Sequence, residues 1–231
     1  MEKLIRGLVQ FRQSELPKRR AQFEELGEGQ DPDTLLLACA DSRVVPSLKT
    51  MAQPGELFTI RTVGNLIAPA GDDGMAVGDV SEAAAVEYAL LVLNVRHVVV
   101  YGHSRCGAMA AAASGKAMPE APNLVEWLRV ATPTMERVQR AELVDHSLPF
   151  VEQLSQVNVL QQLDHLRTYR PVAEGEATGT IHLHGWWFDV GTGETHVYDS
   201  ERGGFVLLDE VEAERILSNA IPAPHLTFTE R

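Results

Sequence analysis

Two cysteines and one histidine stand in short motifs whose residue types are those of a metal site. Cys39 opens the segment Cys-Ala-Asp-Ser-Arg, and His103 and Cys106 begin and end His-Ser-Arg-Cys. The chain has no other cysteine. Two thiolates and one imidazole are a ligand set of catalytic zinc, whereas a structural zinc normally takes four Cys or His ligands. The pattern predicts one zinc ion with a coordination position left for water or substrate. A disulfide between the cysteines, or their burial as inert core residues, is the alternative.

A carboxylate and a guanidinium follow the first cysteine. Asp41 is two residues from Cys39, close enough to accept a hydrogen bond from a zinc-bound hydroxide if it is ionised. Arg43 can keep it ionised and oriented through a bidentate, charge-assisted pair. The alternative for Asp41 and Arg43 is an ordinary structural salt bridge. Beside a zinc ligand, we expect the pair to serve catalysis.

The elements that must position these residues are short strands. Residues 34–40 are almost all apolar and predict a strand buried on both faces, and residues 57–60 and 96–101 predict two more. Asp79 and Glu82 predict the start of a helix that runs through Leu93. This alternation predicts a parallel sheet, in which the carboxyl ends of the strands share one edge. Both chemical motifs would therefore meet there.

The remaining segments predict one α/β domain over residues 1–231, with a mostly parallel sheet, an antiparallel edge strand and flanking helices. Residues 1–30 predict a helical arm, broken near Pro17, that packs on a partner subunit. Residues 171–178 look like an exposed connection, and a hairpin follows that ends near Tyr198. Residues 206–231 are left as a tail of unknown role.

Charge and hydropathy restrict the partners. The chain carries 20 Lys and Arg against 32 Asp and Glu, a formal charge of -12. That balance disfavours nucleic acid and anionic membranes as partners, but it does not affect a small neutral substrate. No apolar run approaches the roughly 20 residues that cross a bilayer. We expect a soluble, cytoplasmic protein.

His182 and His184 form a competing cluster. Two residues apart on a strand, their imidazoles lie on one face and could meet a metal. With no third ligand visible in the sequence nearby, packing in the core or at an interface is the favoured interpretation.

The motifs resemble those of the β-class carbonic anhydrase family. Cys-x-Asp-x-Arg near residue 40 and His-x-x-Cys some 60 residues later are similar to its two signatures. Further similarity lies in Gln-Pro-Gly-Glu-Leu-Phe at 53–58, Gly-Asn-Leu at 64–66, Ala-Ala-Val-Glu-Tyr-Ala at 84–89 and Gly-His-Ser-Arg-Cys-Gly at 102–107. The start of the chain resembles the cyanobacterial, carboxysome-associated branch.

The resemblance implies reversible hydration of carbon dioxide to bicarbonate and a proton, through attack of zinc-bound hydroxide on the carbon. It implies zinc on the two cysteines and His103, one ion per subunit, with Asp41 and Arg43 as the catalytic dyad. Gln30 would bind substrate from across a dimer interface, and Phe58 and Tyr88 would line an apolar substrate pocket. An obligate homodimer, often doubled to a tetramer, is implied as well. Because Leu36 replaces a tryptophan of bicarbonate-inhibited members, we expect Asp41 off the metal near neutral pH.

Two rival functions remain. A hydrolase of carbon disulfide or carbonyl sulfide would use the same metal site with a different pocket entrance. A zinc-bearing scaffold would recruit other proteins to a carboxysome-like shell without turnover. Assays with competing substrates separate the first rival, and an inactive dimer that is full of zinc would favour the second.

Overall fold

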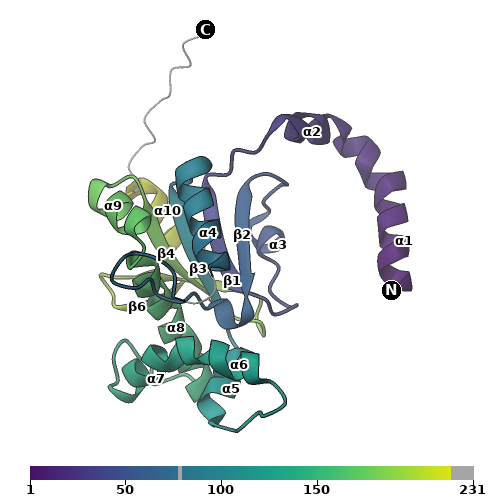
Figure 1. Ribbon diagram of the computed structural model, residues 1–231. Coiled ribbons are helices and arrows are strands. Elements are labelled where there is room, and N and C mark those ends of the chain that lie inside the picture. Colours follow the sequence, from purple (N-terminus) through teal and green to yellow (C-terminus); the bar gives the residue numbers. More distant parts are fainter. Residues whose placement is uncertain (78–79, 220–231) are drawn as a thin grey trace.

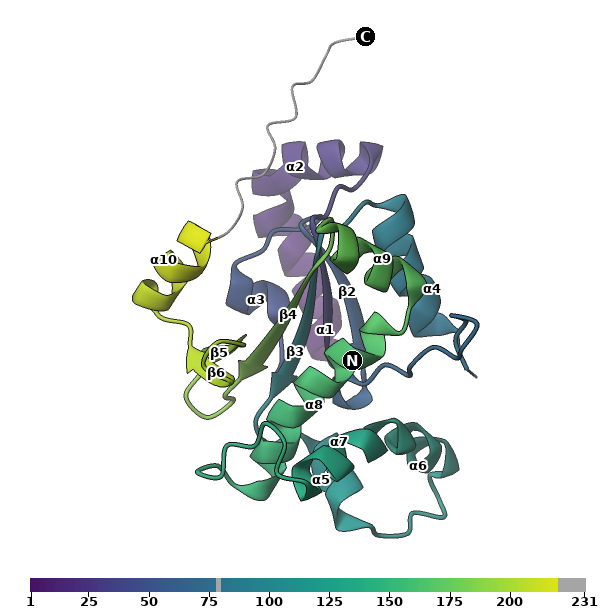
Figure 2. The same ribbon diagram turned by 90° about the vertical axis from the view of Figure 1, so that its left-hand side faces the viewer.

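A six-stranded sheet forms the centre of the computed structural model, which describes residues 1–77 and 80–219 (Figures 1 and 2). Its order is β2-β1-β3-β4-β5-β6, with parallel pairing from β2 through β4 and antiparallel pairing for β5 and β6. The predicted α/β fold is confirmed, and its antiparallel edge has two strands. The strands are β1 Thr34–Cys39, β2 Leu57–Thr62, β3 His97–His103, β4 His182–Phe188, β5 Thr195–Asp199 and β6 Gly204–Leu207.

Helices connect the parallel strands and surround the sheet. The α-helices are α1 Glu2–Gln10, α2 Leu16–Glu28, α3 Pro46–Thr50, α4 Ser81–Glu87, α5 Gly107–Ser114, α6 Pro122–Leu128, α7 Thr132–Gln139, α8 Phe150–Arg167, α9 Arg170–Thr178 and α10 Glu210–Asn219. Short π-helical segments are η1 Phe11–Glu15 and η3 Tyr88–Val92, and 3-10 segments are η2 Val63–Asn65 and η4 Arg129–Ala131.

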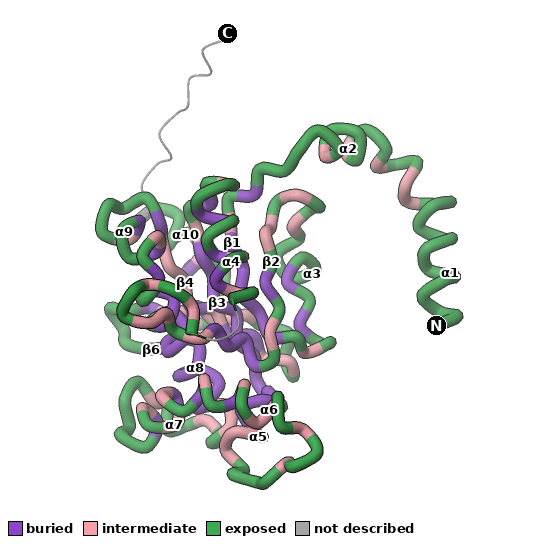
Figure 3. The backbone as a smooth tube through the Cα atoms, in the orientation of Figure 1, coloured by how far each residue is buried: buried purple, intermediate pink, exposed green. Residues whose placement is uncertain are grey.

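The centre of the sheet is apolar on both faces. β1 is Thr-Leu-Leu-Leu-Ala-Cys and is buried from its second residue onward, as a central strand of a parallel sheet must be. Side chains on one face pack with α4, α8 and α9, which Figure 2 shows on one side of the sheet. The other face has a smaller apolar cluster that includes Leu36 and Tyr101. The sheet and the helix that crosses it are the buried centre in Figure 3.

Gly102 determines how closely the long helix α8 approaches the sheet. A Cβ at this position would lie 2.5 Å from Cγ2 of Val159 on α8, well inside normal contact. Glycine in the strand therefore lets helix and sheet pack directly against each other. Since His103 is the next residue, this contact also fixes the carboxyl end of β3.

Residues 171–178 do not form the exposed connection that the sequence predicts, so that prediction is wrong. They belong to α9, in which Val172 is fully buried and Gly175 lies against Ile181. Pro171 stands in the first turn, where its missing N–H is tolerated. Tertiary packing thus stabilises a helix in a segment whose proline and glycine favour a loop.

The carboxyl-terminal region forms regular structure as far as residue 219. Residues 204–207 are β6, and α10 folds back so that Arg215 pairs with the buried Asp199 of β5 at 2.7 Å. This part of the predicted tail therefore packs on its own chain. The rest of the tail and the predicted cap Asp79 lie outside the described residues.

In the amino-terminal arm, α1 stands away from the rest of the chain (Figure 1), whereas Arg19 of α2 donates to the side chain of Gln53 at 2.7 Å. α1 and α2 contain no buried residue, and the break expected near Pro17 is a π-helical segment directly before α2. Leu4 and Leu8 are 67% and 72% exposed. An amphipathic helix with an exposed apolar stripe needs another surface to cover it.

Candidate active site

The two cysteines and His103 converge at the carboxyl edge of the sheet. Cys39 ends β1, His103 ends β3, and Cys106 is the residue before α5. One ligand atom from each lies within 4.8 Å of the others, and all three residues are buried. Among the described residues, no other group of three or more His, Cys, Asp or Glu side chains meets this criterion. Both cysteines are free, so the disulfide alternative is wrong.

The imidazole of His103 is oriented for ligation. Its Nδ1 lies 2.8 Å from the carbonyl oxygen of Ser104, so Nδ1 carries the proton and Nε2 keeps its lone pair. Nε2 is buried and has no hydrogen-bond partner among the described residues. A buried polar atom without a partner is costly unless a ligand satisfies it. Two thiols and this nitrogen match the donors that zinc prefers.

The two thiols interact with each other as well. A hydrogen bond between them lowers the pKa of Cys39 and raises the pKa of Cys106. The backbone N–H of Gly64 also points to Cys39 Sγ at 3.3 Å. A divalent ion would take both sulfurs as thiolates, and this N–H would help to orient the first of them.

Asp41 is held beside the ligands by Arg43. Nε of Arg43 donates to Oδ1 of Asp41 at 2.9 Å, and Nη2 donates to Oδ2 at 2.7 Å. These hydrogen bonds hold the pKa of Asp41 well below its ordinary value. Oδ2 lies 3.9 Å from Nε2 of His103. The ionised carboxylate is therefore engaged by the guanidinium and stands next to the ligand cluster.

Arg61 supports the same loop, a role that the sequence did not reveal. Its Nε donates to the carbonyl oxygen of Cys39 at 2.8 Å, and its Nη2 donates to that of Asp41 at 3.0 Å. Arg61 pairs with Ala38 in the register of β2 and β1. That register is the only signal for its role, and it is a tertiary property.

Helix α8 holds the loop that covers the first cysteine. Asn158 Nδ2 donates to the carbonyl oxygen of Gly64 at 3.0 Å, and Gln162 Oε1 accepts from the N–H of Ile67 at 2.9 Å. Both side chains are fully buried. These bonds explain why α8 carries polar residues on a buried face, since they satisfy backbone groups of the loop.

The three predicted substrate-binding residues are not brought to the ligands within one chain. Gln30 is exposed in the segment between α2 and β1, at the opposite edge of the sheet from Cys39. Phe58 and Tyr88 do meet, with ring centroids 5.8 Å apart. Phe58 pairs with Leu35, four positions before Cys39, or about 13 Å along the strand.

His182 and His184 meet a third histidine rather than a metal ligand set. His97 Nδ1 lies 3.1 Å from His184 Nε2, and the rings of His97 and His182 stack. Burial, together with the neighbouring His97 and His182, lowers the pKa of His184 to about 4. These residues belong to the amino-terminal half of β3 and β4, away from Cys39.

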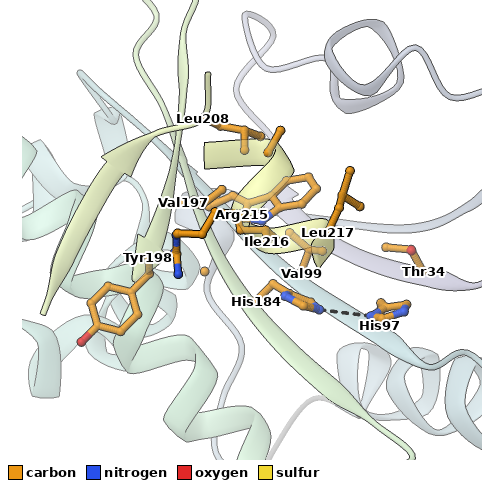
Figure 4. Close-up of a pocket in the computed structure, with 13 residues that line it drawn as sticks. Thr34, His97, Val99, His184, Val197, Tyr198, Leu208, Arg215, Ile216 and Leu217 are labelled. Atoms are coloured by element: carbon orange, nitrogen blue, oxygen red, sulfur yellow. Dashed lines mark hydrogen bonds between the residues drawn. The ribbon is translucent and has the colours of Figure 1, made fainter. Parts of the chain in front are cut away.

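A mostly apolar cavity of about 490 Å³ lies beside α10, on the face of the sheet opposite to α4, α8 and α9 (Figure 4). The residues that line it include His97, His184, Trp186 and Ile216. It includes none of the three predicted ligands. The proposed metal ligands and the cavity therefore lie in different parts of the molecule.

Over the described residues, no helix has the length and apolar character needed to cross a membrane.

Comparison with known proteins places the chain in a family. The carbonic anhydrase family model matches residues 34–195. The carbonic anhydrase of Pseudomonas aeruginosa is 39% identical over 210 residues, which cover 91% of this chain and 93% of that protein.

Solved structures agree. The structure of the β-carbonic anhydrase CcaA has 36% sequence identity and a TM-score of 0.79, covering 91% of this chain and 92% of that one. A structure from a study of two tetrameric β-carbonic anhydrases of Sordaria macrospora has 25% identity and a TM-score of 0.73, covering 85% of this chain and 95% of that one. With the sheet, the cysteine and histidine cluster and the sequence match in agreement, this chain belongs to the β class of the carbonic anhydrase family and is a carbonate dehydratase.

Proposed function

We propose that each subunit holds one zinc ion on Cys39, His103 and Cys106 and uses it to hydrate carbon dioxide reversibly to bicarbonate. The observation that carries this proposal is the convergence of two buried sulfurs and one unpartnered imidazole nitrogen within 4.8 Å. Three such ligands leave a tetrahedral zinc open to one exogenous group. When bound, zinc supplies a Lewis acid that makes water far more acidic than it is in bulk.

Asp41 and Arg43 are the proposed catalytic dyad. The Asp41 carboxylate accepts a hydrogen bond from the reacting oxygen and so orients it toward the carbon. Arg43 has two tasks, since it keeps Asp41 ionised and also holds its oxygens away from the metal position. The bidentate geometry and the lowered pKa of Asp41 support both tasks.

Gln30, Phe58 and Tyr88 are the proposed substrate-binding residues. Gln30 would hold a substrate oxygen, and the two rings would provide apolar surface for a nonpolar gas. Because Gln30 lies at the opposite edge of its own sheet, we assign it to the site of a partner subunit. The 44% exposure of Tyr88 is consistent with a position at such an interface.

The assembly in this proposal is a homodimer that can pair into a tetramer. The exposed apolar stripe on α1 supports it, because a helix of this kind is stabilised mainly by burying that stripe. The similar β-carbonic anhydrases of Sordaria macrospora are tetrameric. A cytoplasmic location and an association with carboxysomes stay predictions.

The function is tested by stopped-flow hydration of carbon dioxide, with zinc measured on the same samples. We expect one zinc per subunit in the wild type and loss of turnover when a chelator removes it. Asp41→Asn should keep its zinc but lose about 10²–10⁴-fold in kcat. Asp33→Asn is the matched control, because Asp33 is exposed at the opposite edge of the sheet.

Two results would contradict the proposal. A zinc-replete wild type without hydration would favour the scaffold, and faster turnover of carbon disulfide or carbonyl sulfide would favour the rival hydrolase. If the Asp41→Asn variant kept the wild-type kcat, Asp41 would have no catalytic role.

A further inference from the structure

Two consecutive backbone carbonyls connect the imidazole ligand to the dyad. The carbonyl oxygen of Ser104 accepts from Nδ1 of His103 at 2.8 Å. The next carbonyl, that of Arg105, accepts from Nη2 of Arg43 at 3.0 Å. Arg105 has a φ of 54°, in the left-handed region that non-glycine residues seldom occupy, so this turn is held by its surroundings. Whatever fixes Ser104 therefore acts on both the ligand and the dyad.

Ser104 is fixed by the start of the connection between β4 and β5. Its side chain is almost fully buried, and its Oγ donates to Oδ1 of Asp189 at 3.1 Å. The same Oγ accepts from the N–H of Val190 at 2.9 Å. The N–H of Ser104 donates to the carbonyl oxygen of Phe188 at 2.8 Å. The hydroxyl is thus satisfied as donor and acceptor, and both partners come from one connection.

Asp189 is itself held by several bonds within that connection. Its Oδ1 also accepts from the N–H of Gly191 at 2.7 Å. Its own N–H donates to the carbonyl oxygen of Glu194 at 2.9 Å, and its carbonyl oxygen accepts from the N–H of Gly193 at 2.8 Å. A carboxylate so constrained offers Ser104 an acceptor in a fixed place.

We propose that Asp189 and Ser104 are positioning residues for the reaction, through which the β4–β5 connection sets the ring plane of His103 and the guanidinium of Arg43. The inference rests on the proposed function, because it assigns these two residues to the same site. Partners that orient a ligand from behind commonly change metal affinity or activity by 10–100-fold when they are removed.

If the bond between Ser104 and Asp189 only stabilised the fold, a different outcome would be expected. Loss of an ordinary buried hydrogen bond lowers the unfolding free energy and leaves kcat and metal affinity unchanged in the molecules that remain folded. Loss of a positioning bond lets the His103 ring and Arg43 move in the folded protein. Rates of zinc release and kcat separate these outcomes.

The experiment compares Ser104→Ala and Asp189→Ala with the zinc-loaded wild type. We expect kcat for carbon dioxide hydration to fall about 10-fold with little change in KM, and zinc release to a chelator to become about 10-fold faster. Asp189→Asn keeps an acceptor oxygen and should recover most of both losses. Glu194→Gln is the control, since its exposed side chain lies in the same connection.

Zinc release is measured without turnover, so it tests the inference even if hydration fails. An inactive wild type would defeat the proposed function alone. An active wild type whose Ser104→Ala variant keeps kcat and zinc release within about twofold of normal would overturn this inference alone. Ser104→Ala removes a single oxygen, so it decides the question even if Asp189→Ala does not fold.

Discussion

At the scale of single residues, Arg43 shows why a guanidinium stands beside the proposed metal site. Its planar fork donates to both oxygens of Asp41 and, from the same Nη2, to the carbonyl of Arg105. A lysine ammonium carries the same charge but cannot reproduce that fork. The role of Arg43 therefore depends on its geometry as much as on its charge.

We predict that Arg43→Lys loses at least about 10-fold in kcat while keeping its zinc, because the carboxylate loses one of its two fixed donors. Stopped-flow rates and zinc content measure both effects. Arg6→Lys, in an exposed pair with Glu2, is the control and should behave as the wild type. Equal rates for Arg43→Lys and the wild type would show that charge alone suffices.

His184 should make stability depend on pH. Its pKa of about 4 lies below the ordinary value of 6.5, so between these values the unfolded chain binds more protons than the folded chain. Its contribution is therefore complete above about pH 6.5 and is lost as the pH falls towards 4. We expect the difference in unfolding free energy between wild type and His184→Gln to shrink by up to about 3 kcal/mol from about pH 7 to about pH 4.

Urea unfolding at fixed protein concentration and several pH values measures this difference. The exposed His146, changed to Gln, is the control for the loss of a histidine side chain. Parallel pH curves for wild type and His184→Gln would contradict the assignment.

The sequence could predict residues that do chemistry with their own side chains. Cys39, His103 and Cys106 are recognisable from residue type and spacing, and the structure brings them together. Arg61 and Asp189 act on backbone groups or on another side chain far away in the sequence. Their partners are set by strand register and by a turn, which no short motif records.

At the scale of elements, α9 shows how packing overrides local preference. Its proline and glycine favour a loop, yet Gly175 is needed because Ile181 occupies the space where a side chain would lie. The existence of the central strands was easier to predict, since β1 is almost entirely apolar and β3 contains the apolar run 98–101, although their bounds differ from the predicted ones by one or two residues.

We predict that Gly175→Ala lowers the unfolding free energy by about 1–3 kcal/mol, although alanine is the better helix former. The new methyl group would stand 2.9 Å from Cβ of Ile181. Gly27→Ala in α2, where a Cβ would meet nothing within 4 Å, is the control and should be neutral or stabilising. Chemical unfolding of both variants checks this, and an unchanged Gly175→Ala would mean that α9 is loosely packed.

At the scale of the whole molecule, the arm and the site are connected by the proposed dimer. α1 exposes its apolar stripe, and Gln30 follows α2 at the far edge of the sheet. If the arm docks on a partner, the same contact would deliver Gln30 to the partner's site. Assembly and catalysis would then be lost together.

We predict that Leu8→Glu converts the dimer to monomer and abolishes hydration while zinc stays bound. A charge in the 72% exposed Leu8 position would have to be buried at the interface. Sedimentation analysis and zinc content measure the outcome. Gln10→Glu adds the same charge on the opposite side of α1 and should remain dimeric. A Leu8→Glu dimer of normal affinity would show that the arm does not join the subunits.

The distance in sequence between the two cysteines has a further consequence. They are 67 positions apart, since Cys39 ends β1 and Cys106 follows the neighbouring strand β3, and the chain between these strands forms α3, β2 and α4. A bound ion would act there as a removable cross-link that closes a long loop, so binding of the ion would increase the free energy of unfolding. A cysteine variant would then lower the melting temperature for two reasons, because it loses the packing of the side chain and also the cross-link through the ion.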